Sequence, residues 1–177
     1  MIQITLNLFT KLSTKQEELD SNIRKQHDIS TDVWLEDLHT NHLLATKNEI
    51  AEVHNEMFDK WKYWKTKEVD EKLILEEAVD VIHFLHLLIN KYQSKPENCV
   101  TFINNQVESI NASLDKVNPN YTKAMDRMLN LRTLEDYLCC YATLLILLET
   151  YNFNLEDIEA AYDIKNEINH LRQEEGY

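Results

Sequence analysis

The sequence predicts an all-α helical bundle, and three observations lead to this prediction. The 177 residues include only one glycine and two prolines, whereas β-rich folds need both residues at their many tight turns. Apolar residues make up 44% of the chain and charged residues 28%, which suits a packed core and excludes a disordered chain. The apolar residues also recur at the spacing of amphipathic helices. The length fits a single domain that spans residues 1–177.

Capping residues and breaks in the apolar pattern divide the chain into helices. The third helix is apolar almost all round, Leu73 included, so we expect it at the centre of the bundle. The second helix is expected to turn Leu44 toward the core. A capping box from Ser94 to Glu97, and a further start at Asn118, predict two short helices in the region that follows. The expected helices cover residues 8–27, 32–58, 70–92, 133–150 and 155–174, with the two short ones between 95 and 131.

The charge balance excludes several classes of function. The chain has 18 basic and 31 acidic residues, a net charge of −13, so direct binding to nucleic acid is not expected. Its longest apolar run, Leu138 to Leu148, is shorter than the roughly 20 residues of a membrane span, and no membrane contact is expected. Cys99, Cys139 and Cys140 lack metal-ligand spacing, which indicates buried thiols in a reducing cytoplasm.

Two pairs of acidic residues stand out. Glu49 and Glu52 lie three residues apart on the second predicted helix, and Glu77 and Asp80 repeat this spacing on the third. If the two helices are antiparallel, the carboxylates meet at one level and repel one another unless a cation lies between them. Hard oxygen ligands without histidine or cysteine favour Mg²⁺ or Mn²⁺. The alternative is that the polar stripe on the third helix is only its solvated face.

Three other clusters support a nucleotide site, although each has a structural alternative. The aromatic and basic block that begins at Trp61 could hold a base and phosphates, or could simply close a helix junction. Lys165, Asn169 and Arg172 share one face of the last helix, which could also be a surface ion-pair face. Gln16 and Asp20 share a face of the first helix, but by themselves they indicate nothing.

In this order, the residues resemble the all-α dimeric dUTPase family of phages, bacteria and trypanosomatids, within the wider all-α nucleoside triphosphate pyrophosphatase group. The paired acidic motifs also occur in MazG-like relatives and are only moderately specific. Residues 93–131 match no pattern of the family. The more specific blocks are Trp61-Lys-Tyr-Trp-Lys65, Glu76-Glu-Ala-Val-Asp-Val-Ile-His-Phe84 and Lys165-Asn-Glu-Ile-Asn-His-Leu-Arg-Gln-Glu-Glu-Gly-Tyr177.

The resemblance implies Mg²⁺-dependent hydrolysis of dUTP, and of dUDP, to dUMP, which keeps uracil out of DNA. Glu49, Glu52, Glu77 and Asp80 would hold two or more ions. Glu49, or else Glu52, would activate the water that attacks the β-phosphorus. This chemistry agrees with the charge balance, because divalent cations reconcile an acidic protein with a polyanionic substrate.

The resemblance also assigns the residues that would contact the nucleotide. Some family members have asparagine where this chain has Asp20, which leaves the base contact of that residue open. The phosphates would meet Lys165 and Arg172, with Lys62 and Lys65 as lesser candidates. The base and sugar would meet Gln16, Asp20, Trp61, His83 and Asn169.

A homodimer is likewise implied by the family. The chain stops at Tyr177, and phage-type members of the family also end there. The expected location is the cytoplasm, that of the host if a phage encodes the protein. Some phage relatives bind host repressors, and the sequence does not decide whether this chain does. The alternative functions are a related pyrophosphatase for dCTP or a broader set of nucleotides, and a helical interaction module without enzymatic activity.

Overall fold

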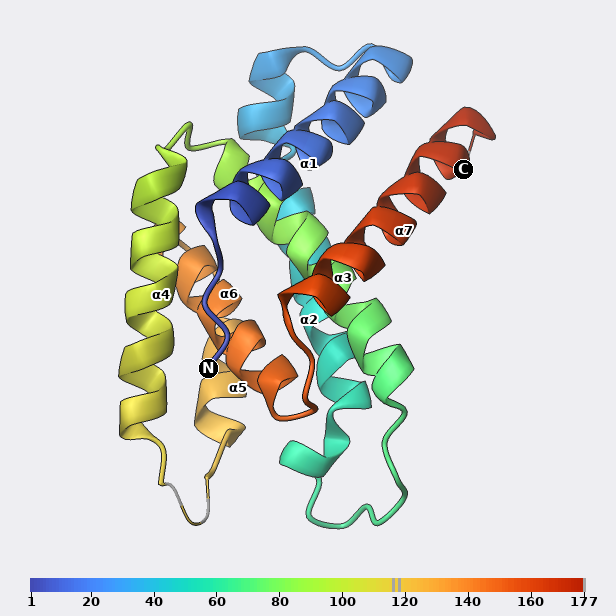
Figure 1. Cartoon of the computed structure of the whole chain (residues 1–177). Coiled ribbons are helices and arrows are strands. Elements are labelled where there is room, and N and C mark those ends of the chain that lie inside the picture. Colours follow the sequence, from blue (N-terminus) through green and yellow to red (C-terminus); the bar gives the residue numbers. More distant parts are fainter. Residues whose placement is uncertain (116, 118, 177) are drawn as a thin grey trace.

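The computed structural model describes residues 1–115, 117 and 119–176, and it is an all-α bundle with no strand among them. Two short turns flank α2: a π-helical turn, η1 (Val33–Asp37), and a 3-10 turn, η2 (Phe58–Lys60). Figure 1 shows these elements in sequence colours. The helices are α1 (Leu6–Gln26), α2 (His39–Glu56), α3 (Glu71–Asn90), α4 (Pro96–Ser113), α5 (Thr122–Met128), α6 (Leu134–Glu149) and α7 (Leu155–Glu174).

The central position of α3 is confirmed. This helix packs against α1, α2, α6 and α7, and Figure 1 shows it crossing the middle of the bundle. Ala78, Ile82 and Leu85 have no exposed surface, as expected for a helix with apolar residues on most of its faces. Leu73 is an exception with 39% exposure, because it lies in the first turn beside the exposed residues Glu71 and Lys72. The prediction for that residue was wrong.

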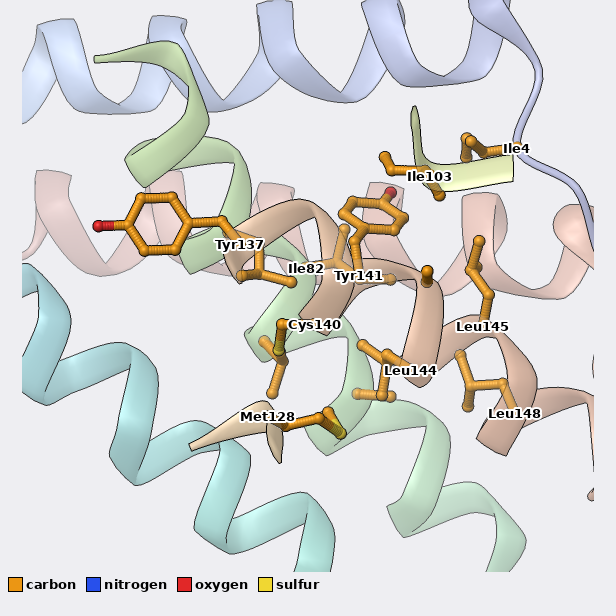
Figure 2. Close-up of a cluster of buried hydrophobic side chains, with 14 of the residues drawn as sticks. Ile4, Ile82, Ile103, Met128, Tyr137, Cys140, Tyr141, Leu144, Leu145 and Leu148 are labelled. Carbon is orange, nitrogen blue, oxygen red and sulfur yellow. The ribbon is translucent and has the colours of Figure 1, made fainter. Parts of the chain in front are cut away.

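The second buried helix is α6, which begins with a capping box. The Thr133 hydroxyl accepts a hydrogen bond from the Asp136 N–H, and the Asp136 carboxylate accepts one from the Thr133 N–H. Tyr141 and Leu144 on this helix are fully buried. Figure 2 shows side chains of α6 among residues from the N-terminal segment and other helices, including Ile4, Ile82, Ile103 and Met128. These contacts join the N-terminal segment, α3, α4, α5 and α6 in one apolar cluster.

The second predicted helix is divided, and the burial expected for Leu44 was wrong. Leu38 separates η1 from α2, and Leu44 is 61% exposed. A π-helical turn holds more residues than an α-helical turn, so it rotates the residues that follow it about the helix axis. A regular α-helix continued from Trp34 would therefore place the wrong residues of α2 toward the core. The buried side chains of α2 instead follow His42, Thr46, Ile50 and Val53.

The region between residues 94 and 131 also differs from the prediction. Its first helix, α4, has 18 residues rather than being short, and the capping residue is Lys95, without a side-chain cap hydrogen bond. The capping box expected at Ser94 is therefore absent there, although Pro96 does occupy the first turn. The second helix, α5, has seven residues and begins at Thr122. The start expected at Asn118 and the terminal Tyr177 lie outside the described residues.

An extended N-terminal segment precedes α1, which begins at Leu6 instead of Leu8. The Thr5 hydroxyl caps the helix by accepting a hydrogen bond from the Leu8 N–H. The segment is fixed to α4, because Asn104 accepts from the Ile4 N–H and donates to the Ile4 carbonyl, both at 3.0 Å. Among the described residues, no helix is both long and apolar enough to cross a lipid bilayer.

Candidate nucleotide and metal site

Four helices that are distant in sequence surround a pocket of about 320 Å³. The lining comes from α1, α2, α3 and α7, and it includes most of the polar residues singled out in the sequence. The apolar part of the lining comes from Leu19, Ile23, Phe84 and Leu87. The polar residues are Gln16, Asp20, Glu49, Asp80, His83, Lys165, Asn169, Arg172 and Gln173.

The antiparallel packing of α2 against α3 brings acidic residues of both helices together. At one end of the pair, the Lys91 ammonium lies 2.6 Å from Nδ1 of His42. At the other end, Glu49, Glu52 and Glu77 each offer a carboxylate oxygen, and these oxygens all lie within 4.8 Å of one another. We call these three residues the carboxylate group.

The carboxylate group is electrostatically unfavourable without a cation. Partial burial, followed by the charges of Asp80, Glu52 and Glu77, raises the pKa of Glu49 to about 7. Burial and neighbouring carboxylates also raise the pKa of Glu77. Three close oxygen donors with unfavourable charge fit a hard divalent ion such as Mg²⁺, which would replace this repulsion by attraction.

Asp80 is not one of the three residues of the carboxylate group, although its charge contributes to the raised pKa of Glu49, and it has a basic partner. Its Oδ2 accepts a hydrogen bond of 2.5 Å from the Lys165 ammonium on α7. Burial still raises the pKa of Asp80, although Lys165 and Arg172 oppose the rise. The ion pair joins α3 to α7 and holds the Lys165 ammonium at the pocket.

A hydrogen-bonded network of buried side chains lies on the α1 side of the pocket. Gln16 Nε2 donates to Asp20 Oδ1 at 2.7 Å, and Gln16 Oε1 lies 2.8 Å from His83 Nδ1. The Tyr162 hydroxyl also donates to Gln16 Oε1, at 3.4 Å, and the Tyr162 ring stacks on His83 with centroids 3.8 Å apart. Gln16 and Asp20, which indicate nothing alone, thus belong to one network with His83 and Tyr162.

The aromatic and basic block lies at the end of α2 and is not among the residues that line this pocket. Trp61 Nε1 donates to the His54 carbonyl at 2.8 Å, and Lys62 donates to the Asn55 side chain at 3.0 Å. The Lys65 ammonium lies 3.5 Å from the centroid of the Phe58 ring. These contacts fit the structural alternative, in which the block closes a helix junction.

The polar stripe of α3 is not simply a solvated face. Glu76 is exposed, but His83 retains only 3% exposure, and the Asn90 amide donates to the Ser13 carbonyl. Lys165 does form an ion pair, as the alternative for α7 holds, but with Asp80 of α3, and both side chains also line the pocket. The solvated-face alternative therefore does not account for His83 and Asn90 on α3.

Sequence reasoning missed Tyr162. It is fully buried, and its hydroxyl also donates to the Leu12 carbonyl at 3.1 Å. The sequence could have indicated Tyr162, because it lies three residues before Lys165 on α7. Residues three or four apart share one face of a helix, so Tyr162 belongs to the same face as Lys165, Asn169 and Arg172.

The comparisons with known proteins identify one family. A family model described as dUTPase matches residues 8–177. No curated protein matches the chain.

Proposed function

Because the chain belongs to the all-α dUTPase family, we propose that it is a Mg²⁺-dependent dUTP diphosphatase that converts dUTP, and also dUDP, to dUMP. Hydrolysis consumes one water and releases pyrophosphate from dUTP or inorganic phosphate from dUDP. Removal of dUTP would keep uracil out of DNA. The family match covers almost the whole chain, and we treat residues 1–177 as one catalytic domain.

The observation that carries the metal proposal is the carboxylate group at the α2–α3 contact. Glu49, Glu52 and Glu77 would hold Mg²⁺, or Mn²⁺ in its place, with Asp80 as a further ligand on the same helix as Glu77. More than one ion would be needed to balance this many carboxylates and a triphosphate. When bound, the ions neutralise phosphate oxygens and lower the pKa of water.

Glu49 is the first choice for the base that takes the proton from the attacking water, with Glu52 as the second. Of the three residues of the carboxylate group, Glu49 is the one that also appears in the pocket lining of the described structure, so it links the group to the space where a nucleotide would lie. A base acts only within hydrogen-bond reach of the proton it accepts, and the position of Glu49 at the pocket supports this choice.

The basic residues of α7 would bind the phosphates. Lys165 is already held at the pocket by Asp80, and Arg172 lies two turns further along the same helix. Phosphate oxygens would take charge-assisted hydrogen bonds from both side chains. Lys62 and Lys65 are lesser phosphate candidates.

The base and deoxyribose would lie toward α1 and the middle of α3. Gln16, Asp20 and His83 offer fixed polar groups there, and Asn169 faces the same pocket. Fixed hydrogen bonds can separate uracil from cytosine, whereas the extra methyl of thymine is excluded by shape. Trp61 stays a proposed base contact, on the segment that follows the acidic residues of α2.

The test is release of pyrophosphate from dUTP by the purified chain, with Mg²⁺ and with a chelator. We expect turnover that requires the metal and returns when it is restored, and release of phosphate from dUDP. A panel of dUTP, dCTP, dTTP and UTP separates the alternatives. Comparable rates on dCTP would overturn the assignment of uracil, and the absence of turnover on every nucleotide would favour an interaction module.

We propose a second copy of this chain as the partner. An apolar stripe of Ile164, Ile168 and Leu171 on α7 is between 40% and 62% exposed. It borders a groove of about 550 Å³ against α3 that includes Leu75 and Val79. A two-fold dimer buries the same patch on both subunits, so one such stripe can cover another.

We also propose a cytoplasmic location. The three cysteines are unpaired, as is usual in a reducing compartment.

Sedimentation of a charged variant tests the dimer. Ile164→Glu should convert the dimer to monomer, because it places a charge in an apolar contact. Leu44→Glu is the matched control, since Leu44 has an exposure of 61% against 62% for Ile164 but lies on α2. A wild-type chain that sediments as a monomer at micromolar concentration would contradict the proposal.

A further inference from the structure

Two residues that line the pocket, Asp20 and His83, each have a buried polar atom without a partner in the described part of the chain, and these atoms suggest the hydrogen-bond pattern of the base. Asp20 Oδ2 and His83 Nε2 are both buried and have no hydrogen-bond partner among the described residues. We propose that Asp20 acts as a neutral carboxylic acid, whose Oδ2–H donates to a uracil carbonyl while His83 Nε2 accepts the uracil N3–H. This inference rests on the proposed function and deepens it, because it makes the selectivity for uracil depend on pH.

The tautomer of His83 follows from its contacts. Gln16 Nε2 donates to Asp20 Oδ1, which fixes the orientation of the amide and leaves Gln16 Oε1 as an acceptor. His83 Nδ1, at 2.8 Å from Gln16 Oε1, must therefore carry the proton. Burial lowers the pKa of His83 to about 3, so the ring is neutral and Nε2 carries a lone pair. Stacking on Tyr162 fixes the plane of the ring.

The position of the proton on Asp20 follows in the same way. Asp20 is 1% exposed, and Oδ1 already accepts from Gln16, so an acidic proton belongs on Oδ2. Burial raises the pKa of Asp20 to about 7. The charge of Glu17 raises this pKa further, whereas the Gln16 hydrogen bond and the charges of Arg24 and Lys91 lower it. The carboxyl is thus protonated through the mildly acidic range.

A donor on Asp20 and an acceptor on His83, which line the same pocket, match the edge of uracil. The N3–H group of uracil donates, and its neighbouring carbonyl oxygens accept. Cytosine reverses both positions, with a lone pair on N3 and an amino group beside it, so His83 Nε2 and the Asp20 hydroxyl would each face a like group. Once Asp20 ionises, it becomes an acceptor only and repels a uracil carbonyl. Preference for uracil should therefore fall as the pH rises through the pKa of Asp20.

Other charged groups line the same pocket. The acidic ones repel the phosphate of a bound nucleotide, and the basic ones attract it. A rate measured against pH mixes their effects with that of Asp20, whereas the ratio of affinities for a uracil and a cytosine nucleotide cancels contributions that both ligands share. These groups are Glu49 on α2, Asp80 on α3, and Lys165 and Arg172 on α7.

The experiment is calorimetric binding of dUMP and dCMP to the full chain without metal. We expect the ratio of the two dissociation constants, dCMP over dUMP, to fall about tenfold between about pH 6 and about pH 8.5 in the wild type. In Asp20→Asn the ratio should favour dUMP at both pH values, because the amide donates whatever the pH. Glu18→Gln, an exposed acid on the same helix, should keep the wild-type dependence.

A second measurement needs no variant. Carbon NMR of labelled aspartate in the dUMP complex should show Asp20 protonated at about pH 6. An ionised Asp20 there, a pH-independent ratio in the wild type, an equal fall in Asp20→Asn, or no detectable binding of dUMP would each overturn the proposal. Failure of the proposed function is distinct, because it would appear as no hydrolysis of dUTP with Mg²⁺ at any pH.

Discussion

Glu77 is a residue whose charge lowers the stability of the fold but is needed for the proposed metal site. Burial and the charges of Asp80 and Glu52 raise its pKa, because the ionised form repels its neighbours. An acid whose pKa is raised by folding favours the folded state less as the pH rises and the group ionises. At neutral pH without metal, its charge therefore lowers the free energy of unfolding.

Glu77→Gln should separate catalysis from stability. We expect kcat to fall by about 10²-fold or more, because the variant loses one proposed ligand charge. The melting temperature in a chelator should rise, since the repulsion within the carboxylate group is relieved. Pyrophosphate release and thermal melting measure the two effects.

The neighbouring Glu76→Gln provides the control. Glu76 is exposed, pairs with Lys72 at 3.5 Å and lies outside the carboxylate group. The Glu76→Gln variant loses the same negative charge from the same helix as Glu77→Gln does. A loss of kcat in Glu76→Gln as large as in Glu77→Gln would show that net charge, and not the position of the ligand, governs the rate.

At the scale of elements, ion pairs fasten α7 to α1. Asp163 pairs with the ammonium groups of Lys11 at 2.7 Å and Lys15 at 2.8 Å. Burial alone would raise the pKa of Asp163, but the two lysines outweigh it and lower the pKa. The stabilisation is therefore present at neutral pH and is lost as the pH falls through the lowered pKa. The contact lies two residues from Lys165, so it sets the position of the basic face of α7.

Asp163→Asn should loosen this arrangement more than it destabilises the fold. These side chains are about one-third exposed, so we expect a loss of about 1 kcal/mol or less in the free energy of unfolding. KM for dUTP should rise several-fold, with little change in kcat. Glu167→Gln, an exposed acid on the same helix, is the control, and an unchanged KM in Asp163→Asn would refute the positioning role.

For the whole molecule, stability depends on an apolar cluster to which the N-terminal segment and each of the helices α1 to α7 contribute buried side chains. Leu144 lies in this cluster (Figure 2) and has no exposed surface, whereas Leu44 is 61% exposed on α2. Both leucines belong to helical apolar patterns in the sequence. Their surroundings differ only in the folded molecule.

Leu144→Ala should therefore lower the free energy of unfolding by about 2–5 kcal/mol, because it removes buried methyl groups and leaves a cavity. Leu44→Ala should change it by less than about 0.5 kcal/mol. Denaturant unfolding measures both. Equal losses would mean that the burial of the two residues is similar in solution.

The sequence by itself determined the helical class, the central position of α3 and the paired acidic spacings on α2 and α3. These features follow from helical periodicity and from spacings of three and four residues, which are local. Family motifs added the activity, because the chain keeps most of those blocks in order.

Only the tertiary structure decided which residues contact one another across helices. The π-helical turn changed the inward face of α2 and exposed Leu44. Ile4 docks on Asn104 of α4, and α1 begins at Leu6 with Thr5 as its cap. Asp80 pairs with Lys165 rather than joining the carboxylate group, and Tyr162 completes the network around Gln16. Each outcome depends on the distance between residues far apart in the chain. The spacing of side chains along one helix cannot predict that distance, because the distance is set by how the helices pack against one another.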